Sequence, residues 1–197
     1  MRDLAWLKRH TAEEDGVQVA DVTSAYAVLS LMGPNSRKLL SKLTDEDLSN
    51  DHFPFGTGKE IEIGYSKALA LRVTYVGELG WELYIPSEFA QDLYDRLLEA
   101  GKEMGLKHAG MHALNSLRLE KAYRHWGHDI TDEDTPLEAG LSFAVAWDKS
   151  GGFLGREALI RKKENGLLKK RMAQFALENP EPLIYLSLIH ISEPTIQ

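Results

Sequence analysis

Hydrophobic and polar positions follow helical or strand spacing over most of the first 165 residues. Apolar residues three or four apart predict helices over Asp3–His10, Asn35–Leu43, Ala109–Tyr123 and Arg156–Lys163, and one capped by Ser87 whose apolar stripe runs from Phe89 to Met104. Alternation with a period of two predicts strands from Gly16 onward and over Glu60–Gly64. Strand-like runs predict others over Tyr26–Met32, Ala68–Val76, Trp81–Pro86 and Ser142–Trp147. This mixture predicts an α+β fold.

One pair of predicted strands indicates a β-hairpin. If Glu78-Leu79 is a two-residue loop, Tyr75 pairs with Glu82, and Val76 pairs with Trp81.

The faces of this hairpin make it the first candidate site. Tyr75, Glu82 and Tyr84 share one face, and Trp81 and Leu83 share the other. Two interpretations are open. Glu82 is either a solvated cross-strand partner, or part of a ligand platform where rings stack and the carboxylate accepts two N–H donors.

Arg118 is the second candidate, because helical spacing places it on the apolar side of the helix Ala109–Tyr123. An inward guanidinium needs a partner. That partner is a carboxylate or carbonyl of the protein, or solvent reached by the end of the side chain, or an anionic or carbonyl-bearing ligand.

Composition narrows the function classes. The chain has 197 residues and a net charge of −7. It has no cysteine, which excludes disulfide scaffolds, thiolate metal sites and cysteine nucleophiles. The acidic balance argues against nucleic acid and anionic membranes, and no apolar run reaches the roughly 20 residues of a membrane-spanning helix. The start of the chain lacks the features of a signal peptide. We therefore predict a small-molecule partner and a cytoplasm-like compartment.

Weaker motifs predict no further site. His108 and His112 are four residues apart, with His125 and His128 nearby, but no third metal ligand has a defined place, so no metal is predicted. No glycine-rich turn has the spacing of a dinucleotide fingerprint, so no flavin is expected on this chain.

The end of the chain departs from the pattern before it. Residues Leu186–Thr195 resemble the translated read-through of a transposon adapter used in sequencing libraries. We predict that residues 186–197 are a non-native tail whose deletion leaves stability unchanged.

Several long motifs together resemble one family. They are Leu43–Ser49, Phe53–Gly56, Tyr75–Tyr84, Ser116–Lys121, Trp126–Asp129 and Thr135–Leu141. Over Asp3–Tyr185 the chain is similar to the folate-binding half of the sarcosine and dimethylglycine dehydrogenases, which is itself similar to the aminomethyltransferase of the glycine cleavage system. Leu114 stands where aminomethyltransferases have an arginine, which favours the dehydrogenases.

The resemblance implies an aminomethyltransferase-type folate-binding domain with antiparallel sheets and flanking helices, truncated at both ends. Residues 1–168 would form this domain without its N-terminal part, and residues 169–185 would begin a truncated C-terminal β domain. Such domains capture on tetrahydrofolate, as 5,10-methylenetetrahydrofolate, the methylene unit released when a separate FAD domain oxidises an N-methylated glycine. The FAD would belong to a missing N-terminal domain, and the isolated fragment is expected to be inactive.

The resemblance also implies site residues. Tyr75, Glu82, Leu83, Tyr84 and Phe143 would contact folate, with Glu82 receiving the N–H edge of the pterin. Arg118 joins them as the candidate for an anionic or carbonyl-bearing ligand. The aspartate that the family uses near the reacting nitrogen would lie before Met1, so the catalytic residue stays unknown.

Two alternatives stay open: a stand-alone aminomethyltransferase, and a non-catalytic regulatory relative of the same fold. Sarcosine and dimethylglycine are not distinguished. The expected location is the bacterial cytoplasm or the mitochondrial matrix.

Overall fold

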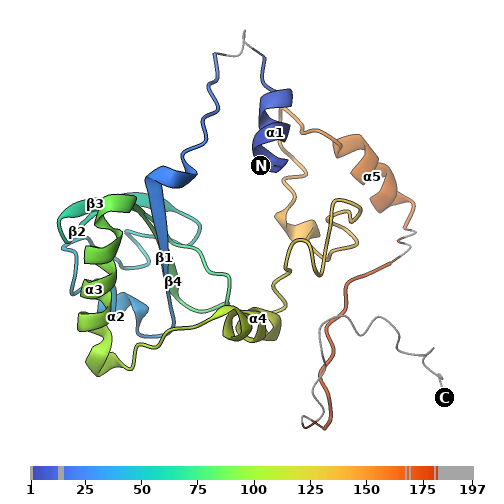
Figure 1. Ribbon diagram of the computed structural model, residues 1–197. Helices are drawn as coiled ribbons and strands as arrows, with labels where there is room; N and C mark the ends of the chain where they lie inside the picture. Colours follow the sequence, from blue (N-terminus) through green and yellow to red (C-terminus); the bar gives the residue numbers. More distant parts are fainter. Residues whose placement is uncertain (1, 13–15, 167, 169, 180, 182–197) are drawn as a thin grey trace. The chain divides into compact units, whose positions relative to one another are not determined.

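The computed structural model describes residues 2–12, 16–166, 168, 170–179 and 181, and the chain divides into two compact units, residues 1–123 and 124–197 (Figure 1). The tail predicted at residues 186–197 lies outside the described residues. None of the described helices has the length and apolar composition needed to cross a membrane.

The first unit is built on one antiparallel sheet. Its strands are β1 (Tyr26–Met32), β2 (Gly58–Ile63), β3 (Ser66–Leu71) and β4 (Gly80–Pro86), in the order β1-β4-β3-β2. Alternate residues of each strand point to the same face, and on β4 these are the buried Trp81, Leu83 and Ile85. One face of the sheet is therefore the wall of the hydrophobic core.

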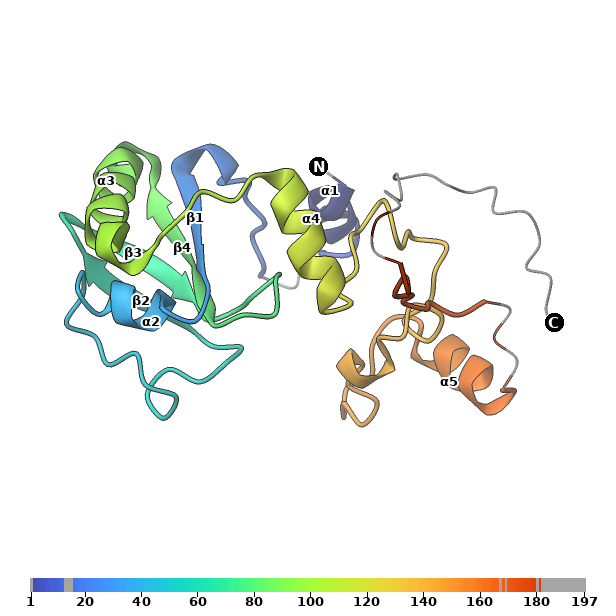
Figure 2. The same ribbon diagram turned by 90° about the horizontal axis from the view of Figure 1, so that it is seen from below.

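Two helices cover this face. They are α2 (Ser36–Leu40) and α3 (Ala90–Gly101), and they lie side by side against the sheet in both views of the ribbon (Figures 1 and 2). Their buried leucines, Leu39, Leu40, Leu93 and Leu97, complete the core. Two further helices of this unit are α1 (Arg2–Arg9) and α4 (Met111–Glu120).

Trp81 lies at the centre of this core. Its ring makes an edge contact with Phe53 at 6.1 Å between centroids, and the guanidinium groups of Arg37 and Arg72 lie 5.9 and 5.8 Å from it. Both arginines donate hydrogen bonds to the side-chain oxygen of Asn50, at 2.7 and 2.8 Å. Burial and the neighbouring positive charge of Arg37 lower the pKa of Arg72. A neutral amide thus orders two guanidinium groups around the tryptophan.

The β-hairpin predicted around Glu78-Leu79 is wrong in its register. Glu82 is opposite Leu71 and not Tyr75, so β3 ends at Leu71 and residues 72–79 form a loop. The Arg72 N–H still donates to the Thr57 carbonyl, in register with the pairing of β2 and β3. The next N–H, of Val73, turns back to the Leu71 carbonyl at 3.0 Å, and the Arg72 guanidinium binds the Phe53 carbonyl and Asn50. Glu82 and Tyr84 still share the face opposite to Trp81, because they are two positions apart on the same strand whatever its pairing.

Some of the other predicted elements are confirmed and some are wrong. The helices α1 and α5 (Arg156–Glu164) and the strand β1 are confirmed, but residues 16–22 form no strand. Ser87 caps no helix, because its hydroxyl donates to the Ser24 carbonyl and α3 begins only at Ala90.

The predicted strand Ser142–Trp147 is also wrong. A 3₁₀ turn spans Ser142–Ala144, and the indole N–H of Trp147 donates to the Ser142 carbonyl at 3.0 Å. This local closure replaces pairing with another strand.

Glu138 organises the second unit. Its side chain is only 5% exposed and accepts hydrogen bonds from the Thr135 N–H and hydroxyl, and the Lys162 ammonium of α5 lies 2.7 Å from it. The Lys162 ammonium and the Thr135 donors lower the pKa of Glu138 from 4.5 to about 2.

This shift predicts a pH dependence of the second unit's stability. The pKa is lower in the folded chain, so the ionised Glu138 carboxylate contributes stability above pH 4.5, which is lost as the pH falls toward 2. We expect Glu138→Gln to lower the melting temperature near neutral pH, and the difference from wild type to vanish in strong acid. Circular dichroism melts against pH check this, with the exposed Glu133→Gln as control. A difference that does not change with pH would contradict the assignment.

Candidate functional site

Glu82 and Tyr84 form a polar pair on the sheet face that the helices do not cover. The Tyr84 hydroxyl donates a hydrogen bond of 2.9 Å to Oε2 of Glu82, and this bond raises the pKa of Tyr84. Both side chains are half-buried, because β4 lies between two other strands.

The surroundings of this pair are largely apolar. In the register of the sheet, Tyr84 lies between Val28 of β1 and Leu69 of β3, and the strand neighbours of Glu82 are Ser30 and Leu71. Val28 and Leu69 are exposed. A carboxylate thus stands on an apolar platform, where it can accept N–H donors from a flat ligand.

Tyr75 lies in the loop 72–79, which packs against the end of α4. Its ring centroid is 6.2 Å from that of Tyr123. A cavity of about 320 Å³ opens beside this loop, lined by residues that include Phe55, Thr74 and Tyr123. Gly80, which precedes Glu82 by two positions on β4, is also part of its lining. The loop and the start of β4 therefore share one cavity, whose lining includes neither Tyr75 nor Glu82.

Arg118 points inward, as its helical spacing predicts, and is 3% exposed. One terminal N–H donates to the Tyr123 carbonyl at 2.9 Å, and Nε donates to the Asn115 side-chain oxygen at 3.3 Å. A protein carbonyl, one of the predicted alternatives, is therefore among its partners. Its contact with folate stays a prediction.

The other two candidates lie elsewhere. The Leu83 side chain is buried in the core, on the sheet face opposite to Glu82. Phe143 is 85% exposed on a 3₁₀ turn of the second unit. Their contacts with folate also stay predictions. The sequence does not point to Tyr123, because an aromatic residue at the end of a helix is a weak signal.

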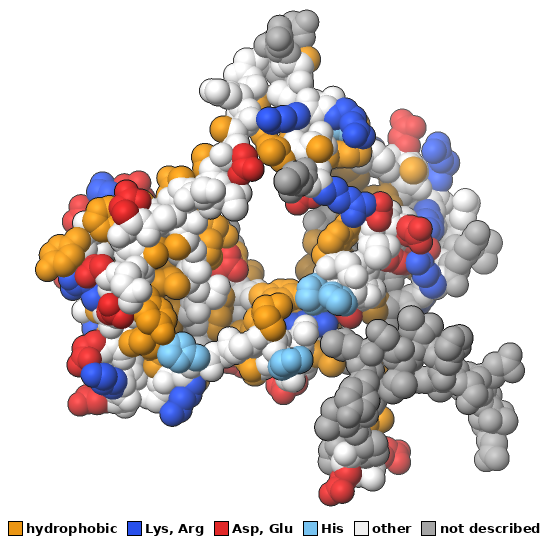
Figure 3. Space-filling model, in the orientation of Figure 1, with side chains coloured by type: hydrophobic (Ala, Val, Ile, Leu, Met, Phe, Trp, Pro, Cys, Tyr) orange, Lys and Arg blue, Asp and Glu red, His pale blue; other side chains and the backbone are white. Residues whose placement is uncertain are grey.

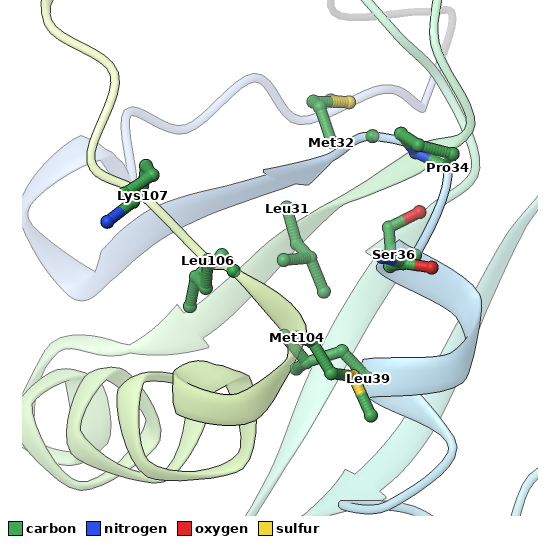
Figure 4. Close-up of a pocket in the computed structure, with 11 residues that line it drawn as sticks. Leu31, Met32, Pro34, Ser36, Leu39, Met104, Leu106 and Lys107 are labelled. Atoms are coloured by element: carbon green, nitrogen blue, oxygen red, sulfur yellow. The ribbon is translucent and has the colours of Figure 1, made fainter.

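Two other cavities contain none of the predicted site residues. One, of about 320 Å³, has mostly apolar walls from Leu31, Met32, Leu39, Met104 and Leu106, with Lys107 at its edge (Figure 4). The other, of about 550 Å³, includes Asp45, Glu46, Glu60 and Glu62.

The surface and the titratable residues indicate no further site. Acidic and basic side chains are mixed on the face of the first unit shown in Figure 3. The described residues include no cluster of three or more histidine or acidic residues that could hold a metal.

Comparison with known proteins identifies the family. The family model of the GCVT N-terminal domain matches residues 1–149. The chain belongs to this family. The α+β fold and the family resemblance drawn from the motifs are thereby confirmed.

Individual relatives are consistent with this membership. The chain is 46% identical over 179 residues to 4-methylaminobutanoate oxidase (formaldehyde-forming) of Paenarthrobacter nicotinovorans, covering 91% of the chain and 22% of the relative. It is 40% identical to the mitochondrial dimethylglycine dehydrogenase of Homo sapiens, covering 90% of the chain and 20% of the relative. The chain thus spans about a fifth of the length of these relatives.

A solved structure shows the same fold. It is the glycine cleavage system aminomethyltransferase T from Bartonella henselae, with a TM-score of 0.58 and 29% identity. The match covers 71% of this chain and 37% of that one.

Proposed function

We propose that this chain binds tetrahydrofolate and serves as the one-carbon-accepting part of an FAD-dependent dehydrogenase of N-methylated glycines. The observation that carries the proposal is the Glu82 carboxylate, oriented by the Tyr84 hydroxyl on an apolar sheet face of a GCVT-family domain.

Hydrogen-bonding capacity supports this ligand. A carboxylate has about four acceptor positions, and Tyr84 uses one of them on Oε2 of Glu82. The pterin edge of folate presents an N3–H and a 2-amino group as two parallel donors, which a carboxylate can accept as a bidentate pair. The rings of Tyr84 and Tyr75 would contact the flat part of the ligand.

The residues of this chain would bind and orient the folate and keep water from it. Tetrahydrofolate supplies the nucleophilic nitrogens that take up the methylene unit, giving 5,10-methylenetetrahydrofolate. The FAD would be held by another part of the whole protein. Sarcosine, dimethylglycine or a related N-methylated amine would be its substrate, in keeping with the names of the relatives.

Calorimetric titration tests the proposal. We expect 5-formyltetrahydrofolate, a stable reduced folate, to bind the folded 197-residue chain at one site. Pterin without the benzoylglutamate portion should compete for that site, because Glu82 would recognise the pterin edge. A folded chain that takes up no folate would overturn the proposal.

A further inference from the structure

The end of α4 reverses in a tight turn. Ala122 has a φ of 56°, in the left-handed region that residues with a Cβ adopt rarely. The Tyr123 N–H returns to the Arg118 carbonyl at 2.9 Å. Such a conformation persists only where surrounding contacts hold it.

Arg118 is the residue that holds this turn. Its guanidinium donates to the Tyr123 carbonyl while its own carbonyl accepts the Tyr123 N–H, so the two residues are joined twice. Since Arg118 is almost fully buried, water competes little for these bonds.

The turn brings α4 against the loop 72–79. The rings of Tyr123 and Tyr75 are tilted by 59° at a centroid distance of 6.2 Å, an arrangement that stabilises aromatic pairs. Beside them, a Cβ on Gly77 would come within 2.4 Å of the Lys121 side chain, and the Lys121 ammonium lies 3.6 Å from the Glu78 carboxylate. The end of α4 therefore contacts the loop at three nearby residues.

We propose that Tyr123 is a positioning residue of the folate site, with its ring setting the place of Tyr75 and Arg118 setting the place of Tyr123. This inference rests on the proposed function. β3 ends at Leu71, so the ladder of the sheet does not extend to Tyr75, and the ring of Tyr123 is one of the contacts that place it. Tyr123 acts through Tyr75 and not through its own hydroxyl.

Five variants, counting the Tyr75→Leu background, test the role by calorimetric titration with 5-formyltetrahydrofolate. Tyr123→Leu should weaken binding about three- to tenfold, the loss expected for one aromatic pair. Tyr123→Phe keeps the ring and should bind like wild type. In a Tyr75→Leu background, Tyr123→Leu should cause no further loss. Tyr65→Leu removes an exposed tyrosine at the turn after β2 and is the matched control.

The outcomes separate this role from the folate function itself. If the wild-type chain binds folate and Tyr123→Leu binds it with the same affinity, the positioning role alone is overturned. Equal damage from Tyr123→Phe and Tyr123→Leu would also overturn it, because the hydroxyl would then be what matters. An additive loss in the Tyr75→Leu background would indicate a general structural effect and overturn it too. A wild-type chain that binds no folate would overturn both proposals.

Discussion

Replacing Trp81 by alanine is expected to lower the free energy of unfolding of the first unit by about 3–5 kcal/mol. Its side chain is 0% exposed, and its removal leaves a cavity between the sheet and the residues around Phe53. The guanidinium groups of Arg37 and Arg72 would also lose the ring that they cover. Their charges would then border an empty apolar space, which lowers the free energy of unfolding further.

Urea unfolding followed by circular dichroism measures this loss. Trp6→Ala is the control, because Trp6 is 52% exposed on α1 and should cost little. Trp81→Phe is the conservative comparison: within the described part of the chain the buried indole N–H has no hydrogen-bond partner, so phenylalanine loses volume but no hydrogen bond. If Trp81→Ala and Trp6→Ala unfold at the same urea concentration, Trp81 does not form the centre of the core.

Whether an element of this domain is predictable depends on how far apart in sequence the residues that determine it lie. The bounds of β1 are predicted correctly because its strand-like run ends at Gly33-Pro34, and both the run and the turn are local. The end of β3 is not predictable in this way. The side chain of Arg72, which follows β3, binds the Phe53 carbonyl and Asn50, which are distant in sequence.

The same distinction applies to the candidate site. A period of two places Glu82 and Tyr84 on one face, and this holds in spite of the wrong register because both residues belong to the same strand. The hydrogen bond between them depends on side-chain rotamers, and the contact of Tyr75 with Tyr123 depends on the left-handed Ala122. Neither leaves a periodic signal in the sequence.

Glu82→Gln is expected to weaken tetrahydrofolate binding by about 1–3 kcal/mol while leaving folding nearly unchanged. The pterin edge brings two donors and needs two acceptors. A glutamine provides one acceptor oxygen and an NH₂ group in place of the second oxygen. One of the two pterin donors would then face the NH₂ group, which is itself a donor, and would have no acceptor. Since Glu82 is half-buried, water compensates only part of this loss.

Calorimetric titration at matched thermal stability measures the change, and Glu62→Gln is the control. Glu62 is an exposed glutamate on the same sheet face, at the edge strand β2, and its cross-strand partner is Lys67 and not an aromatic residue. A loss confined to Glu82→Gln would identify the carboxylate beside Tyr84 as the pterin anchor. Equal affinities in wild type and both variants would mean that Glu82 is a cross-strand partner of the sheet, and that folate is recognised by other residues.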